Sequence, residues 1–217
     1  MVHHGGMDLS NPLASLMPAA DSGALRILAR TGASLSGRRI AELAGGNHTS
    51  TLRALRRLVA QGIVLTEEAG RANLYRLNRS HVLVPAVLEI VGASTAVLRT
   101  LTERIESWRV PCLHAALYGS MARGEAGPAS DIDVLLVRPE SLSDGDASRW
   151  DDQLAGTEDA LYELTGNRLS WLDTTLGDLR RAQQAEEPIF QSWRDDSVLL
   201  VGAPLERLLR DDRATIA

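Results

Sequence analysis

The most constraining feature of this sequence is a pair of aspartates, Asp131 and Asp133, at the head of an apolar run. The run, residues 134–137, predicts a strand whose second half is buried. Because strand residues two apart point to the same face, the two carboxylates are expected to lie side by side. Adjacent carboxylates repel each other unless a proton or a cation lies between them. Hard oxygen ligands at this spacing suit Mg²⁺, with substrate phosphates completing its coordination.

A glycine–serine pair precedes these aspartates. Residues 113–118 predict a short strand, after which Gly119 and Ser120 open a short helix that runs through Arg123. Glycine lets a phosphate approach the backbone closely, and Ser120 adds a hydroxyl donor at the positive end of the helix. Arg123 follows one turn later, where it can neutralise or position an anion. A glycine- and proline-containing loop, residues 125–130, then leads to the aspartates.

The order Gly119-Ser120, Arg123-Gly124 and Ser130-Asp131-Ile132-Asp133 resembles the nucleotidyltransferase fold of the DNA polymerase beta superfamily, in particular its minimal and aminoglycoside types. The resemblance covers residues 112–202. It implies Mg²⁺-dependent transfer of a nucleoside monophosphate from a nucleoside triphosphate to a hydroxyl acceptor, with release of pyrophosphate. The implied roles are triphosphate binding by Gly119, Ser120, Arg123 and Ser130, and binding of one or two Mg²⁺ ions by Asp131 and Asp133.

The family usually supplies a third carboxylate from a later strand. In the matching stretch, residues 169–173, Ser170 falls at that position, and Asp173 lies three residues further on, on the other face of a regular strand. Either Asp173 completes the catalytic set through a bulge or a shifted register, or the third carboxylate is missing. In the second case the domain is catalytically weak or inactive and serves a transcriptional regulator as a nucleotide sensor or dimerisation module. The sequence leaves open whether the protein is an enzyme.

The charge is divided unevenly along the chain. Residues 1–95 hold ten arginines against six acidic residues, whereas residues 96–217 hold thirteen arginines against 22 acidic residues. A basic N-terminal part and an acidic C-terminal part predict two modules with different partners. In the basic part we expect helices over residues 24–30, 38–44 and 49–61, with Asp21-Ser22, Ser36 and Thr49 or Ser50 as their N-caps. Strands over residues 63–66 and 73–77 follow.

This order of helices and hairpin resembles the winged helix of MarR/ArsR-like regulators over residues 21–80. On the third helix Leu52, Leu55, Leu58 and Val59 fall on one side, Arg53 and Arg57 nearly opposite, and Arg56 on a flank. Such a helix can enter the major groove of double-stranded DNA. The candidate DNA-binding residues are Asn47, His48, Thr49, Ser50, Arg53, Arg56, Arg57 and Arg71. The alternatives are arginines that only solvate a helix face, and a winged helix used for dimerisation or protein docking.

The sequence therefore predicts an α+β protein in which an N-terminal winged helix is joined by a helical connector to a nucleotidyltransferase-fold domain with a mixed sheet. The expected divisions are a partly disordered lead-in (1–20), the winged helix (21–80), the connector (81–110) and the transferase-like domain (111–217). Within the last we expect helices over residues 151–165, 176–187 (closed by Pro188) and 205–210, and strands over 131–137, 167–173 and 197–201. A homodimer could form through the connector helix around residues 96–108.

Several classes of protein are excluded by composition. The single cysteine, Cys112, rules out an intramolecular disulfide and a cysteine-rich zinc site. Residues 1–7 lack the basic and apolar regions of a secretory signal. The longest apolar stretch, residues 82–91, is shorter than the roughly 20 residues that span a bilayer. We therefore expect a cytoplasmic protein without a membrane partner.

Overall fold

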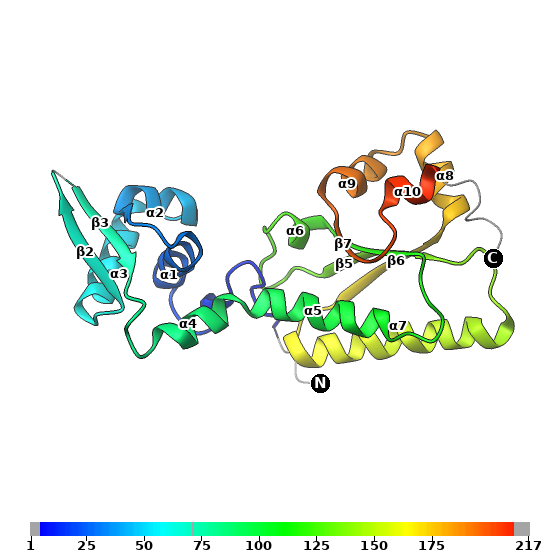
Figure 1. The fold of residues 1–217 in the computed structure, drawn as a ribbon, viewed down its shortest axis with the longest axis horizontal. Helices are drawn as coiled ribbons and strands as arrows, with labels where there is room; N and C mark the ends of the chain where they lie inside the picture. The colour runs from blue at the N-terminus through cyan, green and yellow to red at the C-terminus, as the bar shows by residue number, and fades with distance from the viewer. Residues whose placement is uncertain (1–4, 71, 211–217) are drawn as a thin grey trace. The chain divides into compact units, whose positions relative to one another are not determined.

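The structure is a computed structural model that describes residues 5–70 and 72–210. The chain divides into two compact units. The N-terminal unit comprises residues 11–94, and the C-terminal unit comprises residues 95–210 together with residues 5–10. Figure 1 labels the elements of both units.

The N-terminal unit is a small helical domain with a hairpin. Its sheet has the order β1-β3-β2, and both pairings are antiparallel. The helices followed by a hairpin agree with the order predicted from the sequence. The elements are η1 (Pro12–Ser15), α1 (Ala19–Thr31), β1 (Leu35–Ser36), α2 (Gly37–Ala44), α3 (His48–Ala60), β2 (Val64–Ala69), β3 (Ala72–Leu77) and α4 (Val84–Val91).

The helix caps in this unit agree only in part with the predictions. Ser36 is the N-cap of α2 as predicted, because its side chain accepts a hydrogen bond from the backbone N–H of Arg39. The predicted cap pair Asp21-Ser22 is wrong: α1 begins at Ala19, so both residues lie inside its first turns and are buried. The predicted cap of α3 is also wrong, since Asn47 takes that position.

The core of the N-terminal unit lies between α1, α3 and the hairpin. Leu25 and Leu28 of α1 pack with Leu55 of α3, and Tyr75 and Leu77 of β3 close the same cluster. Val84 and Val87 of α4 add their side chains to it. The hydrophobic face of each element is thus used within the unit.

The C-terminal unit is built around a four-stranded sheet of order β6-β5-β4-β7. Strand β5 runs parallel to β6, whereas β4 is antiparallel to both β5 and β7. The predicted mixed sheet is therefore confirmed. The elements are α5 (Ala93–Glu106), β4 (His114–Tyr118), α6 (Gly119–Ala122), β5 (Ile132–Arg138), α7 (Asp144–Thr165), β6 (Leu169–Thr175), α8 (Leu176–Gln184), α9 (Pro188–Asp196), β7 (Val198–Gly202) and α10 (Leu205–Arg210).

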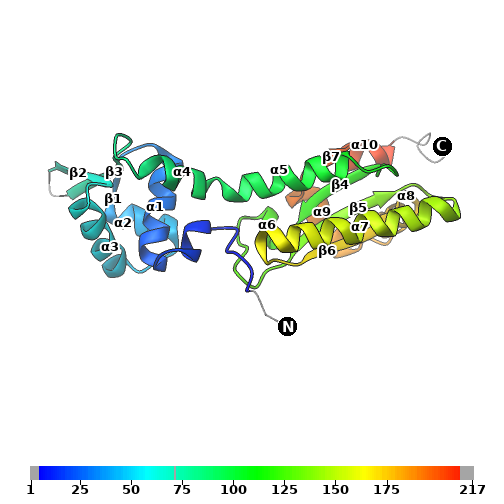
Figure 2. The same cartoon turned by 90° about the horizontal axis from the view of Figure 1, so that it is seen from below.

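Helices cover both faces of this sheet. In Figure 1, α5 and α7 lie below the sheet and α8, α9 and α10 lie above it; Figure 2 shows α5 and α7 from below. The central strand β5 alternates between the two layers. Val134 and Leu136 pack in the cluster with Trp150 of α7, whereas Leu135 and Val137 pack with residues of α8, α9 and α10.

Two helices of this unit differ from the sequence prediction. Helix α7 begins at Asp144, well before residue 151, because Ser143 caps it by accepting from the N–H of Asp146. Pro188 was expected to close a helix, but it is the first residue of α9, a helix that was not predicted. Proline is tolerated at this position because the first helical residues have no intrahelical partner for their N–H groups.

The predicted dimer helix has its apolar side covered within its own unit. Val97, Leu101 and Ile105 of α5 are buried in the cluster that includes Trp150. Among the described residues no single helix is long and apolar enough to cross a membrane; α4 and α5 reach the required length and composition only when taken together across their break.

Candidate functional site

The two aspartates of the predicted motif stand at the start of β5. Asp133 is the second residue of the strand, and Asp131 lies two residues before it, exposed to solvent. Asp133 is half-buried and faces the layer of α8, α9 and α10, because Leu135 and Val137 on the same side of β5 pack there. Burial, and secondly the negative charge of Asp131, raise the pKa of the Asp133 carboxyl. The pair therefore has the mutual repulsion that a cation relieves.

The glycine–serine turn lies directly against this carboxylate. Gly119 has a φ of +72°, a conformation that residues with a side chain rarely adopt. A Cβ atom added at Gly119 would also lie 2.6 Å from Oδ2 of Asp133, so a side chain has no room there. The backbone of residues 119–120 and the carboxylate of Asp133 therefore form one close assembly, in which a phosphate can approach both.

The remaining predicted nucleotide ligands are engaged with the protein itself. Arg123 is exposed, and its Nε pairs with Oε2 of Glu125 at 2.9 Å. The hydroxyl of Ser130 accepts a hydrogen bond from the N–H of Gly127 at 3.0 Å. Ser120 is half-buried in α6, and its carbonyl oxygen accepts from the N–H of Glu125. These contacts shape the loop between α6 and β5.

Two residues that sequence reasoning did not select help to build the site. Tyr118 stands opposite Asp133 in the β4–β5 register, and burial together with the charge of Asp133 raises the pKa of its phenol. Asn167 is buried and donates from Nδ2 to the carbonyl oxygens of Ser130 and Met7. It thereby anchors the loop that delivers Asp131. In the sequence Asn167 is only the first residue of the strand expected over residues 167–173, so no local signal marked it as part of the site.

Asp173 does not join the other two aspartates. The β5–β6 register is regular and pairs Asp133 with Ser170 and Leu136 with Asp173. Trp150 of α7 donates from Nε1 to Oδ2 of Asp173 at 3.0 Å, and Nε of Arg138 lies 3.5 Å from Oδ1. Asp173 therefore faces α7, on the opposite side of the sheet from Asp133, and the alternative of a bulge that brings it to the site is corrected. Ser170, which is exposed, takes the neighbouring position instead.

The donor set fits a magnesium ion held by two carboxylates. Asp131 and Asp133 offer hard oxygen ligands, and the Gly119 turn leaves no side chain between them and a bound phosphate. Within residues 5–70 and 72–210 there is no group of three or more His, Cys, Asp or Glu side chains placed to hold a metal. Phosphate oxygens of a substrate would therefore have to complete the coordination.

The α3 helix of the N-terminal unit is rotated from its predicted orientation. Its buried residues are Thr51, Ala54, Leu55 and Leu58, whereas Leu52 and Val59 are only half-buried. At about 100° per residue, the outward direction then passes through Thr49, Arg53 and Arg56. Arg57 turns toward α1 instead, where it forms a two-point ion pair with the buried Asp21, with Nη2 2.6 Å from Oδ2 and Nε 3.2 Å from Oδ1. Arg57 is still exposed, as the sequence predicted, but its guanidinium is held by Asp21.

The N-terminal end of α3 is already capped. Oδ1 of Asn47 accepts hydrogen bonds from the N–H groups of Thr49 and Ser50, at 2.9 and 3.3 Å. The hydroxyl of Ser50 donates to the carbonyl oxygen of Asn47. The N–H groups of Thr49 and Ser50 are thus already bonded to the cap. His48 is exposed at the same end, and Arg71 lies outside the described residues.

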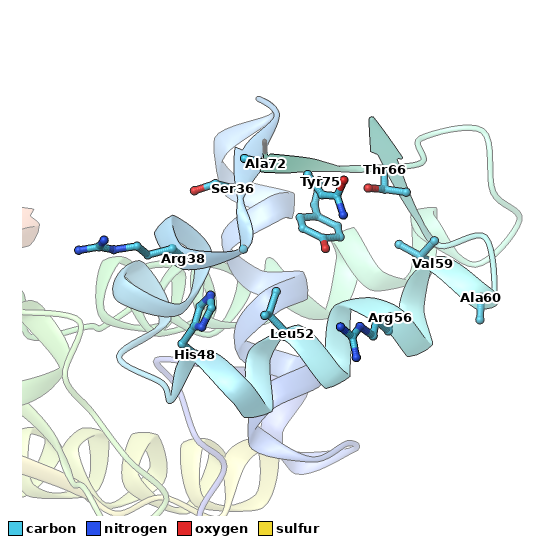
Figure 3. A pocket seen from close by; sticks show the side chains of 12 residues that line it. Ser36, Arg38, His48, Leu52, Arg56, Val59, Ala60, Thr66, Ala72 and Tyr75 are labelled. Atoms are coloured by element: carbon cyan, nitrogen blue, oxygen red, sulfur yellow. The ribbon is translucent and has the colours of Figure 1, made fainter. Parts of the chain in front are cut away.

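A groove of about 570 Å³ separates α3 from the hairpin. Figure 3 shows Leu52 and Arg56 on the α3 side and the ring of Tyr75 pointing toward the helix from β3. His48 lines the end of the groove near the start of α3. Leu52 and Val59 thus line this groove while they also pack against the edge of the core.

Comparison with known proteins bears on the C-terminal unit. No curated protein matches the chain. Residues 101–191 match the family model of a nucleotidyltransferase domain, a span that runs from α5 into α9 and contains Gly119, Asp131 and Asp133. The predicted resemblance to nucleotidyltransferases is thereby supported independently over residues 101–191.

Proposed function

We propose that the C-terminal unit transfers a nucleoside monophosphate from a nucleoside triphosphate to a hydroxyl acceptor. The observation that carries this proposal is the contact between the Gly119 turn and the carboxylate of Asp133, with Asp131 near enough for its charge to act on that carboxylate. The turn binds the triphosphate through its backbone. Asp131 and Asp133 hold Mg²⁺, which when bound neutralises phosphate charge and favours departure of pyrophosphate. The bond between the acceptor oxygen and the α-phosphorus forms as the bond to the pyrophosphate oxygen breaks.

Radiolabel transfer tests this proposal. The protein is incubated with Mg²⁺, each α-phosphate-labelled ribonucleoside triphosphate and fractionated bacterial lysate as a source of acceptors. The Asp131→Asn/Asp133→Asn variant should transfer no label. Asp173→Asn is the matched control and should still transfer label, because Asp173 lies on the other face of the sheet. Equal transfer by the wild type and the Asp131→Asn/Asp133→Asn variant would refute the proposed site.

A second candidate function is nucleotide sensing by a domain that transfers slowly or not at all. The observation that favours it is Ser170, which occupies the register position beside Asp133 where a third carboxylate is expected. A carboxylate at this position would be placed to take the proton of the acceptor hydroxyl, and a serine hydroxyl is a much weaker base. Binding of Mg²⁺–nucleotide by calorimetry, combined with no label transfer to any fraction, would select this function over transfer.

We infer that the N-terminal unit is a winged helix that binds double-stranded DNA. Three observations support this inference: the order of helices and hairpin, the exposed positions of Arg53 and Arg56 on the outward side of α3, and an excess of arginine over acidic residues in residues 1–95. Arg57 is left out of the interface because Asp21 holds it. The N-terminal unit would then bind DNA while the C-terminal unit binds the nucleotide.

Retention on duplex DNA tests this inference at several salt concentrations. The Arg53→Ala/Arg56→Ala variant should bind at least tenfold more weakly and show a smaller salt dependence. The matched control is Arg30→Ala/Arg79→Ala, which should leave DNA binding unchanged. It removes the same charge at the end of α1, where Arg79 lies beside Gly32. Unchanged DNA binding by Arg53→Ala/Arg56→Ala would exclude this face of α3 as the interface.

A further inference from the structure

A pocket of the C-terminal unit lies on the opposite side of the sheet from Asp133. It has a volume of about 360 Å³ and lies between the segment that follows α5 and the middle of α7. Three arginines line it: Arg104, Arg109 and Arg149. Their concentration in one pocket is notable because residues 96–217 carry 22 acidic residues against thirteen arginines. Such a cluster attracts an anion.

The wall of this pocket is held rigidly by side chains of α7. Oε1 of Gln153 accepts hydrogen bonds from the N–H groups of Arg109 and Val110, at 2.8 and 3.1 Å. Its Nε2 donates to the carbonyl oxygen of Val110 at 3.2 Å. Nε1 of Trp108 donates to the hydroxyl of Thr157, which itself donates to the backbone of Gln153. The segment that carries Trp108 and Arg109 is therefore fixed before any ligand arrives.

The indole of Trp108 presents a fixed aromatic surface. Its ring packs edge-on against Trp150 and Trp171, with centroids 5.5 and 5.7 Å away. Next to it in the pocket is Gly156, an exposed glycine in the middle of α7. A Cβ atom added at Gly156 would meet no atom within 4 Å, so the glycine leaves open space on this side of the helix. Glycine within a helix is destabilising relative to alanine, and packing does not require it here.

The polar groups of the pocket select the class of ligand. Arg149 pairs with Asp146, but within the described part of the chain Arg104 and Arg109 form no ion pair and can bind phosphate. The carboxylate of Asp152 also lines the pocket. Because the Asp152 carboxylate accepts hydrogen bonds, the pocket favours a ligand that has hydrogen-bond donors in addition to its negative charge. The hydroxyl groups of ribose and the amino group of a base provide such donors, and a base can stack on indole.

We propose that this pocket binds a nucleotide, with its phosphates on Arg104 and Arg109, its base against Trp108 and a ribose or amino donor on Asp152. This site does not depend on the proposed transferase site. The N–H of Leu113 bonds to the carbonyl oxygen of Val137, so the segment that lines the pocket leads to the end of β5 far from Asp133. Along β5, Asp133 and Val137 are about 13 Å apart. Binding here requires no carboxylate-held metal.

Calorimetric titration with ADP in excess EDTA tests the proposal in the full chain. The wild type should bind ADP without metal, and Asp131→Asn/Asp133→Asn should bind it equally well. Gly156→Leu, which fills the open space with a better helix former, should weaken binding at least tenfold. Arg104→Ala/Arg109→Ala should do the same. Arg99→Ala/Arg181→Ala removes the same charge from exposed pairs elsewhere and should leave the affinity unchanged.

Three results would overturn the proposal. The first is the absence of metal-free ADP binding by the wild type. The second is binding that both pocket variants retain, or that the aspartate double variant loses, since either places the nucleotide elsewhere. The third is inorganic pyrophosphate binding as tightly as ADP, because the base would then contribute nothing at Trp108. We expect pyrophosphate to bind at least tenfold more weakly than ADP.

Discussion

The contact between the Gly119 turn and Asp133 can be tested by adding one methyl group. Gly119→Ala introduces two costs. The residue keeps a φ of +72°, and its new Cβ atom would lie 2.6 Å from Oδ2 of Asp133. Gly124 provides a matched comparison, because it has a φ of +71° and an added Cβ there would meet nothing within 4 Å. Gly124→Ala therefore carries the backbone cost without the collision.

The two variants should differ by the cost of displacing the carboxylate. A non-glycine residue in the left-handed region costs roughly 1–2 kcal/mol, which is our expectation for Gly124→Ala. Forcing an extra methyl group against a packed neighbour adds about 1–3 kcal/mol. We therefore expect Gly119→Ala to lower the free energy of unfolding by about 2–5 kcal/mol. Because Asp133 must move, Mg²⁺–nucleotide binding should also fall at Gly119→Ala and remain at Gly124→Ala.

Urea unfolding followed by tryptophan fluorescence measures this difference in the intact chain. All four tryptophans, Trp108, Trp150, Trp171 and Trp193, lie in the C-terminal unit, so the signal reports on that unit alone. A further variant, Asp133→Ala, removes the carboxylate that the methyl group meets. In that background Gly119→Ala should cost no more than Gly124→Ala. Equal costs for the two glycine variants in the wild-type background would refute the close contact.

Other predictions concern charge and pH. Burial lowers the pKa of His114, whose Nδ1 bonds to the carbonyl oxygen of Ala203, so the unfolded chain takes up a proton more readily and the C-terminal unit should lose stability as pH falls below about 6.5. His114→Asn should reduce this loss in fluorescence-monitored unfolding between about pH 5 and 7. The raised pKa of Asp133 means that protons compete with Mg²⁺ at a higher pH than at an ordinary carboxyl group. Calorimetry should therefore show Mg²⁺–nucleotide affinity falling on acidification, with a lower midpoint in Asp131→Asn. Arg57→Ala should destabilise the N-terminal unit by about 1–3 kcal/mol by circular dichroism, because Asp21 stays buried without its ion pair, whereas Arg53→Ala should not.

The features that the sequence predicted well are those with a local cause. The strand with a buried second half at residues 134–137 and the short helix opened by Gly119 each depend on a few neighbouring residues, and the structure contains both. The predicted offset of Ser170 from Asp173 is likewise a matter of strand periodicity, and the regular register bears it out. Local chemistry was less decisive at helix ends, where Asn47 rather than Thr49 or Ser50 is the cap.

The features that were missed depend on residues far apart in the sequence. The groove beside α3 and the ion pair of Arg57 with Asp21 on α1 both involve other elements, and neither is visible in the periodicity of the helix. Thr51 and Ala54 are buried although neither is strongly apolar. Asn167 gains its role from Met7 and Ser130, which only the folded chain brings to it. Residues of this kind carry no motif of their own.

The choice between transfer and sensing depends on one position, Ser170. Its Cα atom is the register partner of Asp133 across the parallel strands, a separation of about 4.8 Å, and its side chain shares the same face. Ser170→Asp therefore adds a carboxylate where a third one is expected, at an exposed site with no packing to disturb. If the missing carboxylate limits the chemistry, label transfer should rise roughly 10²- to 10⁴-fold, the range for one positioned general base.

Ser170→Asn controls for side-chain size and should leave the rate unchanged. Unchanged transfer in Ser170→Asp, with Mg²⁺–nucleotide binding intact by calorimetry, would show that the proton of the acceptor leaves by another route. The two-carboxylate site would then be sufficient as it stands, and Ser170 would no longer favour a sensor over an enzyme. A gain in Ser170→Asp would instead mean that this chain retains the transferase geometry and lacks only the group that takes the acceptor proton.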